Sequence, residues 1–322
     1  MTFAPLPKMA SVPYYRTEFG EAHLGDSLEL MAQLADKSID LIVTSPPFAL
    51  TRKKEYGNKS ADEYVEWFLE FARQFKRILS DNGSLVIDLG GAYLPGTPVR
   101  AIYQFELLVR LCKELGFFLA QEFYHYNPSR LPAPAEWVNV RRIRVKDSVN
   151  VVWWLSVTEW PKADNRKVLK PYSESMKQLL ENGYKAKKRP SGWDISDKFS
   201  RDNEGAIPPN LLSLANTESN SAYLRRCNEA GIKSHPARFP LDFARFFIDF
   251  LTDEGDVVLD PFAGSNTTGQ AAEMARRRWL AFEIDETYLK GSLYRFQEVN
   301  DLFPLRSDHV PAIHEADEAT TP

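Results

Sequence analysis

The chain has 322 residues, of which 43% are hydrophobic and 26% are charged, and its formal net charge is −4. This composition is typical of a globular protein and excludes a disordered or fibrous chain. No stretch reaches the ~18 uninterrupted apolar residues of a membrane helix. The opening segment lacks the features of a secretory leader, and Cys112 and Cys227 are too few for a disulfide framework or a thiolate metal site. We therefore expect a cytoplasmic protein with no membrane partner and no bound metal.

Strand and helix patterns alternate along the first 125 residues. The helical pattern is clearest where Trp67, Phe68, Phe71 and Phe75 recur at helical spacing. Alternating strands and helices predict a parallel α/β sheet. The expected strands are 22–25, 40–44, 84–89 and 117–125, and the expected helices are 27–35, 61–79 and 99–115.

The pattern weakens in the middle of the chain and then resumes. A strand at 148–157 is rich in β-branched and aromatic residues, and 157–232 is expected to be a largely irregular inserted module. We expect later helices at 240–252, 266–277 and 286–298 and strands at 256–260 and 279–283. The proposed division is a first half at 20–156, the module at 157–232 and a second half at 233–300, with terminal segments 1–19 and 303–322. Beyond Phe303 the acidic tail is expected to be disordered.

Charge is distributed unevenly. Residues 125–200 contain 15 Lys or Arg and 8 Asp or Glu, a local balance of +7 that leaves −11 for the remainder. A basic segment in an acidic body is typical of a nucleic-acid-binding face. A solvated surface that happens to be basic explains the charge equally well, so charge alone does not decide.

The segment around Asp260 has the pattern of a ligand-binding turn. An apolar strand ends at Asp260, the small-residue loop 261–265 follows, and a helix begins near Asn266. Open α/β sheets bind ligands at such strand ends. Neither a phosphate loop nor GxGxxG is present, which disfavours nucleoside triphosphates and NAD. With Glu283 ending the next strand, the pattern suits an adenosine with a cationic tail, although a tight turn capped by Ser265 or Asn266 fits equally well.

A second loop, Thr44-Ser45-Pro46-Pro47-Phe48, follows the expected strand 40–44. Two consecutive prolines fix the backbone and remove two N–H donors, which leaves rigid carbonyl acceptors. The alternative is a stiff turn with a buried phenylalanine.

The two loops together resemble those of the amino-methylating DNA methyltransferases, specifically the cytosine-N4 class in its β arrangement. In that arrangement the catalytic loop precedes the recognition module and the cofactor loop comes last, and the resemblance covers about residues 20–300. It extends to GDSLEL, TSPPFAL, RKKEYGN, GGAY, EWVN, IRVKD, VWW, TEWPK, RPSG, IPPNLL, HPARFP and GSNTTG.

The resemblance implies a fold and a reaction. The fold is a doubly wound, mostly parallel α/β sheet, the circularly permuted S-adenosylmethionine-dependent methyltransferase fold, with an inserted target-recognition module. The reaction is methyl transfer from S-adenosyl-L-methionine to the N4 amino group of cytosine in double-stranded DNA, as the modification arm of a type II restriction-modification system. Likeness within the module points to CAGCTG, the site on which a companion restriction endonuclease would also act.

Roles for individual residues follow from this resemblance and from the chemistry. The Pro46 carbonyl and the Ser45 hydroxyl would accept hydrogen bonds from the exocyclic amine and stabilise its developing charge, and Phe48 would stack on an extruded base. Asp88 either orients Ser45 or caps a turn. Serine at position 45 favours cytosine over adenine. The expected catalytic residues are Ser45, Pro46, Pro47, Phe48, Asp88 and His235.

The expected cofactor-binding residues are Asp26, Asp260, Pro261, Phe262, Gly264, Ser265, Asn266, Thr267, Thr268 and Glu283. Asp26 could equally be the N-cap of the helix that follows it. Asn266 stands where many members of the class have glycine, so the backbone dihedral angles of this loop are not settled by the resemblance. The expected DNA contacts are Arg141, Arg142, Arg144, Lys146, Lys185, Lys187, Lys188 and Arg189.

Two other reactions on a base are disfavoured. Cytosine-C5 methylation is disfavoured because neither cysteine follows a proline, and zinc-dependent deamination is disfavoured because its ligand motifs are missing. An adenine-N6 methyltransferase, an enzyme that acts on RNA or a small molecule, and a catalytically silent DNA-binding protein stay open.

Overall fold

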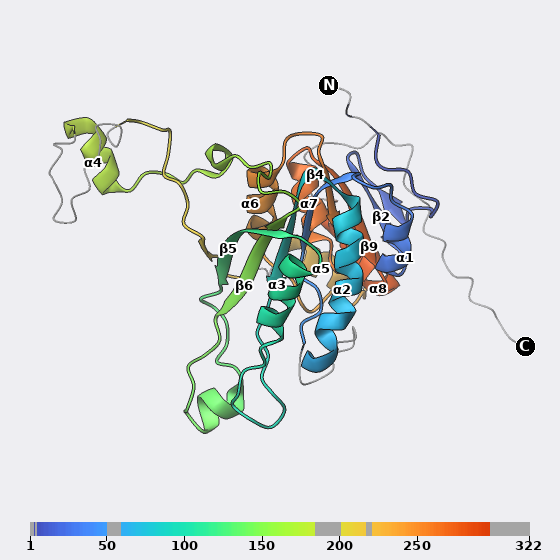
Figure 1. Ribbon diagram of the computed structural model, residues 1–322, viewed down its shortest axis with the longest axis horizontal. Coiled ribbons are helices and arrows are strands. Elements are labelled where there is room, and N and C mark those ends of the chain that lie inside the picture. Colours follow the sequence, from blue (N-terminus) through green and yellow to red (C-terminus); the bar gives the residue numbers. More distant parts are fainter. Residues whose placement is uncertain (1–2, 4, 50–58, 184–200, 217–220, 297–322) are drawn as a thin grey trace, which may run out of the picture.

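The computed structural model describes residues 3, 5–49, 59–183, 201–216 and 221–296 (Figure 1). Within these residues the strands form a nine-stranded sheet in the order β1-β2-β9-β8-β3-β4-β6-β5-β7. Neighbours from β2 to β4 are parallel, β6 runs antiparallel to both β4 and β5, and β1 runs antiparallel to β2. The mostly parallel sheet is therefore confirmed. The strands are β1 Tyr15–Arg16, β2 Gly20–Leu24, β3 Ile39–Thr44, β4 Leu79–Leu89, β5 Phe118–Tyr126, β6 Val149–Ser156, β7 Leu211–Ser213, β8 Val257–Asp260 and β9 Arg278–Glu283.

Helices cover both faces of the sheet. One apolar cluster joins the first face to α1 (Ser27–Ala32), α2 (Ala61–Ile78) and α3 (Tyr103–Lys113). The other joins the opposite face to α6 (Leu241–Leu251), α7 (Thr267–Met274) and α8 (Glu286–Ser292). The apolar residues of β3 alternate between the two clusters because successive side chains of a strand point to opposite faces, and a central strand buried on both faces is mostly apolar.

The predicted elements of the two halves are present, with shifted ends. The helix predicted at 61–79 is α2, which begins with a capping box between Ser60 and Glu63 and buries its aromatic stripe. β4 begins five residues before the predicted 84, because Leu79 pairs with Ile39 and an irregularity in register absorbs the residues that follow. Such pairing is not visible in the sequence of one strand.

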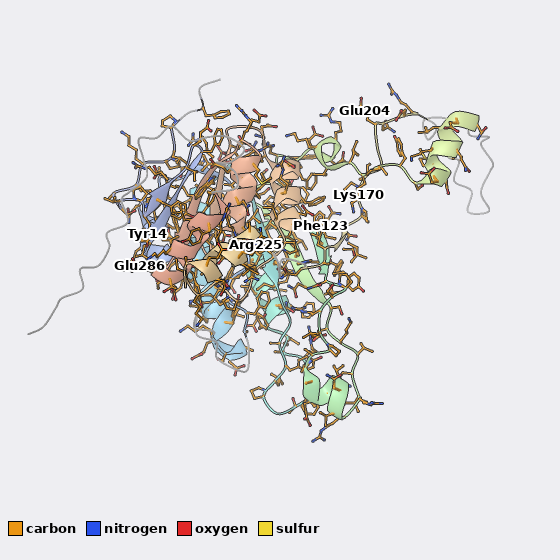
Figure 2. All side chains as sticks on the ribbon, turned by 180° about the vertical axis from the view of Figure 1, so that it is seen from behind. Tyr14, Phe123, Lys170, Glu204, Arg225 and Glu286 are labelled. Carbon is orange, nitrogen blue, oxygen red and sulfur yellow. The ribbon has the colours of Figure 1, made fainter. Side chains whose placement is uncertain are left out.

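The predicted module 157–232 is irregular over much of its described length but holds several elements: a 3-10 turn at Asn165–Val168, α4 (Glu174–Asn182), β7 and α5 (Ala222–Glu229). β7 extends the sheet beside β5, and α5 packs near the C-terminal end of the described chain, where Arg226 donates to the carbonyl of Tyr294 at 3.2 Å. The α4 region projects from the body. Its stem is closed by two hydrogen bonds between Lys170 and Ala206, and Figure 2 shows Lys170 and Glu204 along it.

A second projection leaves the sheet between β5 and β6. This arm, residues 127–148, contains a π-helical turn at Glu136–Val140 and extends away from the body in Figure 1. The arm and the α4 region thus leave the body in different directions (Figure 1). None of the helices in the described ranges combines the length and apolarity needed to span a bilayer.

Candidate active site

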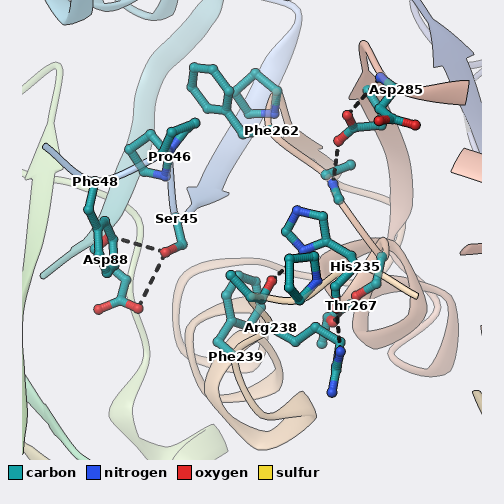
Figure 3. A pocket seen from close by; sticks show the side chains of 18 of the residues that line it. Ser45, Pro46, Phe48, Asp88, His235, Arg238, Phe239, Phe262, Thr267 and Asp285 are labelled. Atoms are coloured by element: carbon teal, nitrogen blue, oxygen red, sulfur yellow. Dashed lines mark hydrogen bonds between the residues drawn. The ribbon is translucent and has the colours of Figure 1, made fainter. Parts of the chain in front are cut away.

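A cavity of about 800 Å³ lies where the parallel strands of the sheet end, and both predicted loops line it. Ser45, Pro46, Pro47 and Phe48 follow β3 on one side. The loop that follows β8 lines the other side (Figure 3). The sheet brings the loops together because parallel strands place all their carboxyl ends at one edge.

Asp260 connects the two loops instead of lining the cavity. Its Oδ1 accepts hydrogen bonds from Thr44 Oγ1 at 2.8 Å and from the Phe262 amide at 3.1 Å, and its Oδ2 accepts one from Thr268 Oγ1 at 2.7 Å. The side chain is fully buried, and this desolvation raises its pKa to about 6 although the three hydrogen bonds lower it. Because Thr44 immediately precedes Ser45, Asp260 holds the cofactor loop in register with the catalytic loop.

Asn266 has a structural role that explains why it replaces glycine. Its φ of 55° lies in the left-handed region, where glycine and then asparagine are best tolerated. Its Oδ1 caps α7 by accepting from the Gly269 amide at 3.0 Å, and its Nδ2 donates to Tyr15 Oη at 2.9 Å. Asn266 is fully buried and, like Thr268, is absent from the cavity wall. We therefore assign both residues to loop support.

The remaining predicted cofactor residues do line the cavity: Asp26, Pro261, Phe262, Gly264, Ser265, Thr267 and Glu283. Glu283 accepts from the amides of Gly264 at 2.7 Å and Asp285 at 2.9 Å, and burial raises its pKa. Asp26 is also the N-cap of α1, since its Oδ1 accepts from the Leu28 amide at 2.8 Å. The two alternatives left open for Asp26 therefore coexist.

An aromatic wall at the cofactor side was missed by the sequence analysis. The Phe262 ring lies 4.9 Å from that of Phe71 and 5.9 Å from that of Trp67, centroid to centroid, and all three line the cavity. The helical spacing of Trp67 and Phe71 indicated a core face, and nothing in the pattern showed that the face continues into a cavity.

Ser45 and Phe48 are positioned by the end of β4. The Ser45 hydroxyl donates to the backbone carbonyl of Asp88 at 3.3 Å and to its Oδ2 at 3.5 Å, so Asp88 does orient Ser45 (Figure 3). The Phe48 ring packs directly on Gly90, where a Cβ atom would lie only 2.4 Å from a ring carbon. The Gly90 carbonyl is in turn fixed by the Tyr103 hydroxyl at 2.5 Å.

His235 lies on the cofactor side of the cavity, across from Ser45 (Figure 3). Its Nδ1 is 2.5 Å from the carbonyl oxygen of Ala237, and its ring meets that of Tyr288 edge-on at 4.6 Å. A Cβ at Gly264 would approach the ring to 3.1 Å. The imidazole therefore packs on the cofactor loop, and its expected catalytic role stays a prediction.

Three polar residues beside Asp88 also escaped the sequence analysis. Asn150 donates to Asp88 Oδ2 at 3.3 Å and accepts from Arg130 at 3.0 Å. His125 Nδ1 lies 3.8 Å from the same carboxylate oxygen, and neither ring nitrogen has a hydrogen-bond partner in the described part of the chain. The only available signal was the presence of His125 and Asn150 within otherwise apolar or aromatic strands.

The expected DNA contacts fall into two groups. On the arm, Arg141 pairs with Glu136 at 2.8 Å, Arg144 donates to the Pro98 carbonyl at 3.3 Å, and Lys146 donates to the carbonyls of Pro128 and Arg130. Arg142 is exposed. The basic run Lys185, Lys187, Lys188 and Arg189 lies outside the described residues. The expected contacts of these residues with DNA stay a prediction.

A mostly parallel sheet between two helical layers, with a turn after β8 and an acid at the end of β9, defines an S-adenosylmethionine-dependent methyltransferase fold. The family model N6_N4_Mtase, described as DNA methylase, matches residues 39–294. The chain belongs to this family.

Individual relatives agree with the family. The chain is 55% identical to "Type II methyltransferase M.PvuII" of Proteus hauseri over 89% of this chain and 87% of that protein. A solved structure named PvuII DNA methyltransferase (cytosine-N4-specific) superposes with a TM-score of 0.74 and 46% identity, covering 92% of this chain and 95% of that one. The Thermus thermophilus protein TTHA0409, solved in complex with S-adenosyl-L-methionine, has a TM-score of 0.51 at 21% identity, over 86% of this chain and 95% of that one, and shares the fold.

Proposed function

We propose that the protein transfers a methyl group from S-adenosyl-L-methionine to the N4 amino group of cytosine in duplex DNA. The observation that carries the proposal is the meeting of Ser45, Pro46 and Phe48 with the loop after β8 in one cavity. The likeness to a relative named as cytosine-N4-specific supports the choice of base.

The cavity walls suit the cofactor. The aromatic rings of Phe262, Phe71 and Trp67 offer an apolar surface for a purine, and the buried Glu283 carboxylate offers acceptors for ribose hydroxyls. Asp26 and Asp285 add negative charge, which favours a cationic ligand. When bound, S-adenosyl-L-methionine supplies an electrophilic methyl group on a sulfonium.

The catalytic loop suits an exocyclic amine. The amine of cytosine is a weak nucleophile because its lone pair is delocalised into the ring. The Pro46 carbonyl and the Ser45 oxygen can accept its two N–H bonds, which favours a pyramidal nitrogen and stabilises the charge that develops during attack. Phe48 provides a stacking surface for a base taken out of the duplex, and the fixed loop supplies proximity.

The finer assignments rest on the likeness to M.PvuII. We propose CAGCTG as the recognition sequence and a companion restriction endonuclease acting on the same site, with no physical complex between the two proteins implied. The module 157–232 and the basic arm 127–148 are proposed to contact the duplex, with base reading by residues still to be mapped. The enzyme would work in the cytoplasm, together with its DNA substrate.

The decisive experiment is incubation with labelled S-adenosyl-L-methionine and duplex DNA, followed by mass spectrometry of the nucleosides. N4-methylcytosine is the expected product. N6-methyladenine would keep the cofactor and overturn the base assignment drawn from Ser45. Absence of any methylated nucleoside, with cofactor bound, would refute the proposal and favour RNA, a small molecule or a silent DNA-binding role.

A further inference from the structure

A continuous chain of hydrogen bonds runs from the root of the arm to the catalytic serine. Arg130 Nη1 donates to Asn150 Oδ1 at 3.0 Å, and Asn150 Nδ2 donates to Asp88 Oδ2 at 3.3 Å. The Ser45 hydroxyl donates to the same carboxylate oxygen at 3.5 Å. All four residues line the cavity, so the chain forms one of its walls.

The direction of every hydrogen bond in this chain is fixed by its members. A guanidinium can only donate and a carboxylate can only accept, whereas an amide and a hydroxyl can do either. Arg130 therefore requires the oxygen of the Asn150 amide, which turns the NH₂ group towards Asp88. The Ser45 hydroxyl has two acceptors on Asp88, the carboxylate oxygen at 3.5 Å and the backbone carbonyl at 3.3 Å, and neither can donate, so the hydroxyl hydrogen is directed to Asp88. With that hydrogen committed, the Ser45 oxygen can meet a substrate only as an acceptor.

The fold enforces this arrangement. In the antiparallel pairing of β4 with β6, Asp88 lies opposite Val152. Asn150 lies two residues before Val152 in β6, so both polar side chains share one face of the sheet. Asp88 is 3% exposed and Asn150 is 8% exposed. Buried polar groups at such depth are costly unless they are paired, which favours these contacts for Asp88 Oδ2 and Asn150; Asp88 Oδ1 has no hydrogen-bond partner among the described residues.

Arg130 is held from the opposite side. Lys146 donates to the carbonyls of Pro128 and Arg130 at 3.2 Å and 3.1 Å, which clips the root of the arm. Asn127 closes the same root through a backbone hydrogen bond to the Ser148 carbonyl at 2.8 Å. These hydrogen bonds fix the segment that carries Arg130 and so hold its guanidinium against Asn150.

We propose that Asn150 and Arg130 are positioning residues that commit the hydroxyl hydrogen of Ser45 to Asp88, so that the serine oxygen accepts from the exocyclic amine of the target base. The inference rests on the proposed function, because it assumes an amine as the group to be methylated. It holds for either cytosine or adenine. No proton leaves Ser45 in this role, and the effect is one of orientation.

The test is a double-mutant cycle between Asn150→Asp and Ser45→Ala, with single-turnover methyl transfer into DNA as the readout. Asn150→Asp keeps the shape but removes the only donor of the side chain, and we expect a loss of about 10- to 100-fold in rate at saturating DNA. In the Ser45→Ala background, where Pro46 still offers its carbonyl, the same change should cost less than about threefold, because residues that act through one group are not additive.

Two further measurements separate positioning from folding. The dissociation constant of S-adenosyl-L-methionine should stay unchanged in Asn150→Asp. Its thermal midpoint should fall, because the new carboxylate lies buried beside that of Asp88, so the rates are compared well below that midpoint. The matched control is Asn228→Asp on the exposed side of α5, which should leave the rate at the parental value. If Asn150→Asp fails to fold, two variants of Arg130 provide the test. Arg130→Lys keeps a group that only donates and should retain a higher methylation rate than Arg130→Gln at saturating DNA.

The outcomes are distinct. Equal losses from Asn150→Asp with and without Ser45 would overturn the inference, as would equal activity of Arg130→Lys and Arg130→Gln. A change in the Michaelis constant for DNA alone would overturn it too and make Arg130 a DNA contact. Methylation of DNA by the parental protein in the same assay keeps the proposed function separate from these results.

Discussion

The buried carboxyl of Asp260 predicts a particular dependence of stability on pH. Burial raises its pKa from the usual 3.8 to about 6 in the folded protein. The folded state therefore binds this proton more tightly than the unfolded state does. The resulting stabilisation is complete below pH 3.8 and is lost as the pH rises towards 6, after which it stays absent. At 1.36 kcal/mol per pKa unit, the loss is about 3 kcal/mol.

Asp260→Asn removes this titration without emptying the site. The amide oxygen can still accept from Thr44 and Phe262, and the Thr268 hydroxyl has a second acceptor in the Val43 carbonyl at 3.5 Å. We expect the variant to match the parental protein near pH 4.5 more closely than at pH 7.5, where its free energy of unfolding should be higher by up to about 3 kcal/mol.

The assay is urea unfolding of both proteins without cofactor at several values between pH 4.5 and 8. Comparing the two curves cancels the titration of all other carboxyls. Asp242→Asn, on an exposed position in the first turn of α6, serves as the control for the loss of one exposed negative charge. A pH-independent difference for Asp260→Asn, or a variant that loses stability as the pH rises, would refute the reasoning.

Three other changes test the site. Gly90→Ala places a methyl group 2.4 Å from the Phe48 ring and should lower turnover by about 10- to 100-fold while the affinity for cofactor stays constant; normal turnover would show that the ring position is unimportant. Asn266→Ala loses the cap of α7 and the bond to Tyr15 and forces alanine into a φ of 55°, which together should lower the free energy of unfolding by roughly 2–3 kcal/mol. Asn266→Gly should recover about 1 kcal/mol of that loss, and equal stability of the two variants would contradict the backbone argument. Arg142→Gln should reduce the slope of log affinity for DNA against log salt by about 1, whereas Arg276→Gln, next to the amino end of β9, should leave it unchanged; a matching slope for both would remove Arg142 from the interface.

Much of the fold was predictable because its signals are local. The aromatic stripe of α2 and the apolar strands β3, β8 and β9 have periodicities that a short window of sequence displays. The turn after β8 and the two prolines after β3 were recognisable because both interrupt such a pattern at the end of a strand. The parallel sheet then required that they meet.

Contacts that depend on distant partners were missed. Asp260 and Thr268 were expected to bind cofactor, which stays a prediction, and the sequence did not show that they contact each other or that Asp260 contacts Thr44, 216 residues away. Trp67 and Phe71 had the spacing of core residues. β7 is only three residues long and exists because β5 offers an edge with which it can pair.

The sequence by itself determined the order of strands and helices in the two halves 20–156 and 233–300, the place of both loops and the kind of chemistry that their residues can perform, since each depends on neighbours within a few positions. Only the tertiary structure decided which polar groups are buried together. Asp88, Asn150 and Arg130 come from three separate segments, and their hydrogen bonds have a direction that no one segment contains. Burial favours that pairing, and burial is a property of the assembled sheet.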